Sequence, residues 1–255
     1  MTASLDGQSI LVTGGTRGIG AAIAREVAAH GAAVAVAGRD VDAAEAVVAS
    51  IAAAGGRAIA VACDATDEQH CREAVRSTVD AFGHLDTVFA NQGVGGPPAP
   101  VTEWPAAAVA ACLEVNLISC LSLASAAQPD LAADGGGRFI VTGSGTGHSN
   151  AAGMGMYGIS KAAAAHLVKQ LALEWRPLHI AVNELVPGPV RTAMTGFDPA
   201  NPRSEAGQNR FEEFVDGLGE WLKDPEDVAP LARYLATLPT NGPSGQVFSL
   251  AGRIT

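Results

Sequence analysis

The chain has 255 residues, of which 48% are hydrophobic, and its 16 basic and 26 acidic side chains give a net charge of −10. This length suits one α/β domain with a large core, and the acidic balance argues against a nucleic-acid or anionic-membrane partner. Residues 1–7 lack the basic and apolar regions of a signal peptide, and we expect no apolar segment long enough to span a bilayer. The sequence therefore predicts a cytoplasmic protein.

Strand and helix patterns alternate along the chain with short connections, which predicts a parallel sheet of about seven strands with helices on both faces. Strands are expected at 9–13, 33–38, 58–62, 85–90, 137–142, 179–185 and 246–250, and helices at 18–30, 41–54, 67–82, 103–133, 155–175 and 226–238. Residues 1–255 form a single domain in this interpretation. Segment 193–222 breaks the alternation, and we expect it to cover a substrate pocket as a lid.

A glycine-rich turn, Thr13–Gly20, lies between the first apolar strand and the first helix. Glycines let the backbone approach a pyrophosphate closely, and the N-terminus of the following helix offers free N–H groups and a positive dipole end. The turn therefore indicates a dinucleotide site at the carboxyl end of the strand.

A second signal is the pair Tyr157 and Lys161, four residues apart in a chain with two tyrosines. Positions i and i+4 share a helix face. The ammonium of Lys161 can then stabilise the phenolate form of Tyr157, which favours proton exchange near neutral pH. A surface helix with an unremarkable tyrosine and lysine would show the same spacing, but the glycine turn favours the catalytic interpretation.

Together, the two motifs resemble the short-chain dehydrogenase/reductase family in its shorter branch, whose Gly-x-x-x-Gly-x-Gly spacing matches Gly14, Gly18 and Gly20. The resemblance covers nearly the whole chain. It implies a Rossmann-type, doubly wound sheet and a reversible oxidoreductase that interconverts a ketone or 3-oxoacyl carbonyl and an alcohol. Tyr157 would exchange the proton, and Lys161 would also bind the nicotinamide ribose.

The resemblance implies two further catalytic residues. Ser144, thirteen residues before Tyr157, would polarise the substrate carbonyl, although Thr142 and Thr146 compete for this role. Asn116 would hold a water that links Lys161 to solvent, and the alternative is a buried amide with satisfied hydrogen bonds. The Gly-Ser-Gly sequence around Ser144 is also typical of a hydrolase nucleophile, but no suitably placed histidine and acid follow.

Arg39 follows the second strand, where an acidic residue would bind the 2′-hydroxyl of NAD. A guanidinium binds phosphate through two parallel hydrogen bonds, so Arg39 and Arg17 favour NADP(H) over NAD(H). The alternative is that Asp40 binds the ribose. The resemblance also implies cofactor contacts, at the adenine for Asp64 and at the carboxamide for Thr192. The full set of expected cofactor residues is Gly14, Thr16, Arg17, Gly18, Ile19, Gly20, Arg39, Asp64, Asn91, Gly93, Tyr157, Lys161, Pro187, Gly188, Val190 and Thr192.

The sequence departs from the family pattern at Gln92, where Asn-Ala-Gly is usual, and at Ala251–Arg253, where Asp-Gly-Gly is usual. The four cysteines lack metal or disulfide spacing, so we expect no metal. Small residues in the helices at 103–133 and 155–175 predict a homo-oligomer, because the family pairs its subunits through these helices as dimers or tetramers. An NAD-dependent alcohol or polyol dehydrogenase and a non-catalytic dinucleotide-binding regulator stay open as alternative functions.

Overall fold

The computed structural model describes residues 4–96, 99–150, 152–197, 205–217 and 219–252. One parallel sheet of seven strands, in the order β3-β2-β1-β4-β5-β6-β7, forms its centre. The strands are β1 (Ser9–Thr13), β2 (Ala33–Gly38), β3 (Arg57–Ala62), β4 (Thr87–Ala90), β5 (Arg138–Thr142), β6 (Ala181–Val186) and β7 (Val247–Ser249). The expected seven-stranded, doubly wound architecture is confirmed.

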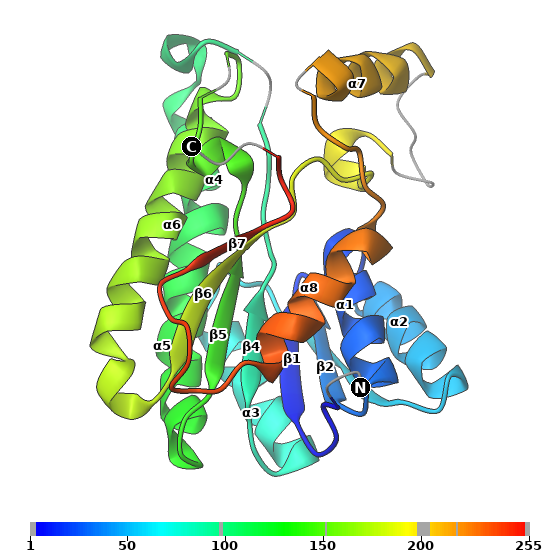
Figure 1. The fold of residues 1–255 in the computed structure, drawn as a ribbon, viewed down its shortest axis with the longest axis vertical. Coiled ribbons are helices and arrows are strands. Elements are labelled where there is room, and N and C mark those ends of the chain that lie inside the picture. Colours follow the sequence, from blue (N-terminus) through cyan, green and yellow to red (C-terminus); the bar gives the residue numbers. More distant parts are fainter. Residues whose placement is uncertain (1–3, 97–98, 151, 198–204, 218, 253–255) are drawn as a thin grey trace.

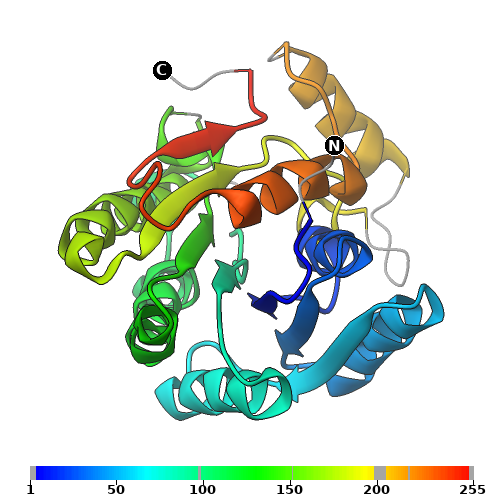
Figure 2. The same cartoon turned by 60° about the horizontal axis from the view of Figure 1, so that its bottom comes forward.

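Helices cover both faces of the sheet (Figures 1 and 2). They are α1 (Gly18–Ala29), α2 (Val41–Ala53), α3 (Glu68–Phe82), α4 (Ala106–Leu113), α5 (Ser119–Ala133), α6 (Gly155–Glu174), α7 (Glu205–Gly217) and α8 (Pro225–Thr237). Helices α1, α2 and α8 pack on one face and share one apolar cluster with the strands. Helices α3, α5 and α6 pack on the other face around a second cluster.

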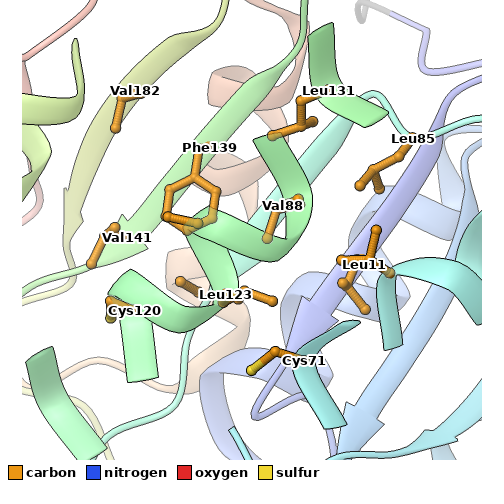
Figure 3. Close-up of a cluster of buried hydrophobic side chains, with 14 of the residues drawn as sticks. Leu11, Cys71, Leu85, Val88, Cys120, Leu123, Leu131, Phe139, Val141 and Val182 are labelled. Carbon is orange, nitrogen blue, oxygen red and sulfur yellow. The ribbon is translucent and has the colours of Figure 1, made fainter. Parts of the chain in front are cut away.

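The second cluster shows why the strands read as nearly continuous apolar runs. Figure 3 shows side chains from β1, β4 and β5, among them Leu11, Val88 and Phe139, in the same cluster as Leu123 of α5. Alternate residues of the same strands, such as Ile10 and Phe89, enter the cluster on the other face. Because both faces are covered, both sets of side chains must be apolar. All four cysteines are free and buried, Cys63, Cys71 and Cys120 in this second cluster.

The strand order reverses between β1 and β4. The chain builds β1, β2 and β3 outward, then returns so that β4 pairs with β1 on its other side. The loops that follow β1 and β4 therefore diverge at the carboxyl ends of these two strands. The crevice between such loops is where doubly wound sheets bind ligands.

The helix expected at 103–133 differs from the observed structure. A short 3₁₀ turn, Val101–Glu103, precedes Pro105, and α4 begins only at Ala106. A π-helical turn, Glu114–Ile118, then separates α4 from α5. One extra residue in a helical turn leaves the apolar pattern almost unchanged, so the sequence gives no sign of it.

From Ala106 to Ala133 the helical run is 28 residues long and apolar enough, by length and composition, to cross a membrane. The expectation that no segment reaches this length is therefore wrong. The core helix of a water-soluble protein meets the same criteria, and this one packs against the sheet through Leu123 and Leu131. Only 28% of its most apolar stretch is buried within the chain, so an apolar face is left exposed.

The lid expected at 193–222 contains a 3₁₀ turn, Ala193–Thr195, and helix α7, which stands apart from the sheet in Figure 1. Residues 198–204 and 218 of this segment lie outside the described part of the chain. Trp221 follows α7 in the chain and is 60% exposed.

Candidate active site

Neighbouring backbone segments pack tightly against the glycine turn after β1. Gly14 has φ +61°, and a Cβ atom there would lie 2.9 Å from the backbone N of Gln92. A Cβ atom on Gly20 would overlap the carbonyl of Gly14, so this glycine brings α1 up against the turn. The first turn of α1, with Gly18 and Ile19, therefore directs its free N–H groups past the end of β1, as a phosphate site requires.

A chain of hydrogen bonds runs from this turn to Lys161. Asn91, after β4, donates to the carbonyl of Gly14 at 3.2 Å and accepts from the hydroxyl of Thr142 at 3.0 Å. The buried ammonium of Lys161 donates to the carbonyl of the same Thr142 at 2.8 Å. The ends of β1, β4 and β5 are thus tied to α6, and the lysine is held at the point where the strand order reverses.

Tyr157 and Lys161 lie on the same side of α6. The ammonium of Lys161 is 6.0 Å from the centre of the Tyr157 ring. The Tyr157 hydroxyl makes no hydrogen bond with another described residue, so it can still engage a ligand. The i, i+4 spacing therefore produces the phenol–ammonium neighbourhood that the sequence indicates.

Two glycines allow the Ser144 loop to pack closely against α6. A Cβ atom on Gly147 would lie 2.9 Å from the backbone carbon of Lys161, and one on Gly158 would lie 2.8 Å from the carbonyl of Thr146. Ser144 caps the short turn that follows it and exchanges a 2.9 Å hydrogen bond with the Thr146 hydroxyl. Ser144 and Tyr157 do not hydrogen-bond to each other.

Asn116 lies in the π-helical turn and is fully buried. Its amide accepts from the N–H of Val94 at 2.8 Å and donates to the carbonyl of Val94 at 2.9 Å. It also donates to Ser160 on α6 at 2.9 Å. The side chain is therefore satisfied, as in the structural alternative. It also lies beside Lys161, because a Cβ atom on Gly93 would be 3.4 Å from the oxygen of Asn116 and 3.5 Å from the ammonium of Lys161.

The end of β2 has no room for an acidic side chain. A Cβ atom on Gly38 would overlap the methyl group of Thr16. Asp40 caps α2 by accepting from the N–H of Ala43 at 3.0 Å, so its carboxylate is already engaged. The exposed guanidinium groups of Arg17 and Arg39 make no hydrogen bond or ion pair with another described residue.

Asp64 follows β3 at the carboxyl edge of the sheet, as Arg39 does after β2. It accepts from both the N–H and the hydroxyl of Thr66, at 3.0 and 2.8 Å. These hydrogen bonds, with a smaller contribution from the positive charge of Arg39, hold the pKa of Asp64 below its ordinary value. The carboxylate is therefore fixed and charged, within reach of the positive charge of Arg39.

The turn after β6 completes the site. Thr192 lies beside the glycine turn, because a Cβ atom on Gly18 would be 3.3 Å from its methyl group. Gly188 has φ +71° and lies next to Ala251 of the carboxyl-terminal segment. Pro187 and Val190 are buried, and the side chain of Val190 packs in the core cluster that includes α8.

The comparisons with known proteins agree with this geometry. Residues 8–202 match the family model for the short chain dehydrogenases. The chain belongs to this family. It is therefore an oxidoreductase that acts on hydroxyl or carbonyl groups of small molecules with a nicotinamide dinucleotide.

Full-length relatives of this short-chain dehydrogenase include the 7α-hydroxysteroid dehydrogenase of Escherichia coli strain K12, at 32% identity over 97% of this chain and 94% of the relative. A 7α-hydroxysteroid dehydrogenase solved with NADH and 7-oxo glycochenodeoxycholic acid has a TM-score of 0.86 at 30% identity, over 99% and 97% of the two chains. A short-chain dehydrogenase from Burkholderia cenocepacia J2315, solved with NADP, has a TM-score of 0.84 at 34% identity, over 98% of each chain. Structures similar to this chain have thus been solved with either dinucleotide.

Three features of this short-chain dehydrogenase were not expected from the sequence. Gln92 links Thr13 of β1 to Ser119 of α5 through its side-chain amide. Arg191 pairs with Glu212 of α7 at 3.4 Å and with Asp224 before α8 at 3.6 Å, so it joins α7 to the start of α8. A buried glutamate, Glu184, lies beneath the Ser144 loop. Its sequence signal is a charged residue, next to the polar Asn183, inside a strand whose other residues are apolar.

Proposed function

We propose that this short-chain dehydrogenase interconverts a carbonyl and a secondary alcohol with NADP(H), and that Tyr157 is its general acid and base. The observation that carries the proposal is the buried ammonium of Lys161, fixed by Thr142 and placed 6.0 Å from the centre of the Tyr157 ring. The bound dinucleotide would supply or accept the hydride.

Tyr157 and the residues around it would carry out proton transfer and stabilise the charges that develop. In reduction the Tyr157 hydroxyl gives its proton to the carbonyl oxygen, and in oxidation it takes the alcohol proton. The positive charge of Lys161 stabilises the phenolate that reduction leaves behind. Ser144 donates a hydrogen bond to the same oxygen as negative charge develops on it. Asn116, beside Lys161, supports the return of a proton from solvent.

The preference for NADP(H) is supported by charge and space at the end of β2. Arg39 and Arg17 are exposed guanidinium groups without a partner in the described chain, and a phosphate would provide one. Asp40 is engaged as a helix cap, and a side chain on Gly38 would overlap the methyl group of Thr16 unless Thr16 moved. An NAD-dependent alcohol or polyol dehydrogenase is the second candidate, since one similar structure was solved with NADH.

The substrate is proposed to be a ketone or 3-oxoacyl compound of partly apolar character. Phe197 and Phe211 meet edge to face, with 6.0 Å between ring centres, in the proposed lid segment, and this apolar pair supports a partly apolar substrate. The similarity to hydroxysteroid dehydrogenases makes cyclic ketones the first class to test.

A homo-oligomer is proposed from the exposed apolar face of α5 and α6. On α5 and the preceding π-turn, Ile118 and Leu121 are 40% and 44% exposed, and on α6 Ile159 and Leu173 are 50% and 69% exposed. The two helices lie side by side in Figure 1. A second copy of the chain would cover this face in a dimer, and a tetramer would need a further interface.

Replacement of Tyr157 by phenylalanine tests the catalytic proposal. NADPH oxidation is followed by absorbance with a panel of cyclic ketones, 3-oxoacyl thioesters and small diketones, and NADPH binding by fluorescence. Tyr157→Phe should reduce turnover by about 10²–10⁴-fold while NADPH still binds. The other tyrosine, Tyr234 of α8, provides the matched control, because Tyr234→Phe should leave turnover unchanged. Turnover of Tyr157→Phe within a few-fold of the parent would falsify the assignment.

A further inference from the structure

The carboxylate of Glu184 is buried in β6, with 1% of the side chain exposed. A buried carboxylate without a partner is strongly unfavourable. Its partner is His148, whose Nε2 lies 2.9 Å from Oε2 and 3.1 Å from Oε1 of Glu184. The imidazole is 13% exposed, so the pair lies almost entirely inside the chain.

The two residues fix opposite ends of the loop that carries Ser144. At one end, the N–H of Gly143 donates to the carbonyl of Leu185 at 2.8 Å, and the carboxylate of Glu184 fills the space beside the glycine. At the other end, His148 reaches back to the same carboxylate. Between these points the loop closes on itself, since the N–H of Gly147 donates to the carbonyl of Ser144 at 2.9 Å.

We propose that Glu184 and His148 are a positioning pair for Ser144, in which the buried carboxylate holds both ends of the 143–148 loop so that the serine hydroxyl faces the substrate carbonyl. This inference rests on the proposed function, in which Ser144 donates to the substrate oxygen. Neither member of the pair touches the reacting atoms, and both act through the serine.

The charge of Glu184 also reaches the reaction centre. The groups that face the carboxylate are His148 from the loop and, at longer range, the ammonium groups of Lys161 and Lys169 from α6. The positive charge of Lys161 favours the charged form of the Glu184 carboxylate, so the two groups interact electrostatically. A neutral residue of the same shape at 184 should therefore disturb the site electrostatically even where the loop keeps its path.

Amide hydrogen exchange measures how firmly the 143–148 loop is fixed, and it does not require an active enzyme. In His148→Ala, peptides that cover 143–149 should exchange about tenfold faster than in the parent, with no change in α1 or α2. His148→Gln keeps a side-chain N–H that can reach Glu184, so its exchange should return toward the parent. The control is His84→Ala, because His84 also pairs with a carboxylate, Asp86 at 3.0 Å, but before β4 at the opposite end of the sheet.

Steady-state kinetics with NADPH and the best ketone of the panel then test the action through Ser144. In His148→Ala, kcat should fall by about tenfold or more, toward the 10²–10³-fold loss caused by removal of one oxyanion donor, whereas the Kd of NADPH should stay within about threefold. Glu184→Gln should alter the pH profile of kcat, and His148→Gln should recover most of the lost kcat. In a Ser144→Ala background, His148→Ala should cause no further loss of kcat, because its target is already absent.

The outcomes separate the inference from the proposed function. If amide exchange in the 143–149 loop is faster in His148→Ala but the parent is inactive on every ketone, the proposed function is refuted. The conclusion that His148 and Glu184 fix the loop would still hold. Unchanged exchange would overturn the inference. An additive loss of kcat in the Ser144→Ala background would also overturn it, as would a parallel loss of NADPH binding and thermal stability, which would indicate a purely structural pair.

Discussion

The carboxylate of Glu184 occupies the space that a Cβ atom on Gly143 would fill. The two residues meet because β5 and β6 pair in register, with Val141 opposite Glu184 and Gly143 just beyond the end of β5. The carboxylate is also held by His148, so it cannot turn aside freely. The glycine before Ser144 is therefore matched to the glutamate on the neighbouring strand.

This match predicts a non-additive pair of substitutions. Gly143→Ala should destabilise the protein by about 1–3 kcal/mol, because the added methyl group overpacks a buried site. Combining it with Glu184→Ala removes the obstacle, so the double variant should be at least about 1 kcal/mol more stable than the two separate losses predict. Urea unfolding at fixed protein concentration measures these values.

Gly217→Ala is the control for this double-mutant cycle, because a Cβ atom at that helical position would meet nothing within 4 Å. It should leave the free energy of unfolding unchanged or slightly raised. Simple additivity of Gly143→Ala and Glu184→Ala would show that the loop can move away from the carboxylate.

Burial raises the pKa of Glu184 above its ordinary value of 4.5, and the hydrogen bond and charge of His148 oppose the shift only in part. The native protein then binds a proton at Glu184 at a higher pH than the unfolded chain does. Stability contributed at this site should rise as the pH falls from the raised pKa toward 4.5, and it should be lowest above the raised pKa.

The free energy of unfolding is measured against pH for His148→Gln and for His148→Gln/Glu184→Gln. Because His148 is absent from both proteins, their difference reports the titration of Glu184. As the pH falls through that window, the glutamate-containing protein should gain about 1.4 kcal/mol relative to its partner for each pH unit by which the pKa is raised. A constant difference between pH 7 and 4.5, or one of opposite sign, contradicts the expected direction.

Cofactor preference is expected to depend on Arg39. Arg39→Ala should weaken NADPH by about 1.5–3 kcal/mol, or one to two decades in Kd, because only NADPH carries the 2′-phosphate. NADH binding should change little. Arg176→Ala removes the same charge from an exposed 3₁₀ turn at the amino end of β6, and it serves as the control. Equal weakening of both cofactors would show that Arg39 contacts something other than the phosphate.

The sequence predicts those parts of the molecule that depend on local patterns. Buried strands read as apolar runs, and the glycine turn and the Tyr157–Lys161 spacing read as motifs because each is fixed by a few neighbouring residues. The structure places both motifs at the carboxyl edge of the sheet, with Asn91 and Thr142 between them.

Features that depend on distant contacts were not predictable in this way. His148 and Glu184 are 36 residues apart, and nothing in either local segment indicates that they meet. The π-turn at Asn116 inserts a single residue into a helical pattern, and Arg191 finds its acidic partners on two separate elements. Each requires the register of strands and helices to be known first.

The exposed face of α5 and α6 leads to a prediction about assembly. Ile118 and Leu121 recur at helical spacing on one helix, and Ile159 is 50% exposed on the neighbouring one. If a second copy covers this face, the parent should be a dimer or tetramer at micromolar concentration. Leu121→Glu should weaken the association at least about tenfold, since a buried, unpaired carboxylate opposes docking.

Sedimentation velocity measures the mass of the parent and of the variant at several concentrations. The control is Val41→Glu, which adds the same charge at a 37% exposed position in the first turn of α2, where an acidic side chain suits the helix dipole. This variant should keep the parent mass. A parent dimer that Leu121→Glu reduces to monomer would place the contact on α5 and α6. A parent tetramer reduced to dimer would indicate that a second interface persists elsewhere. A monomeric parent at micromolar concentration would refute the assembly.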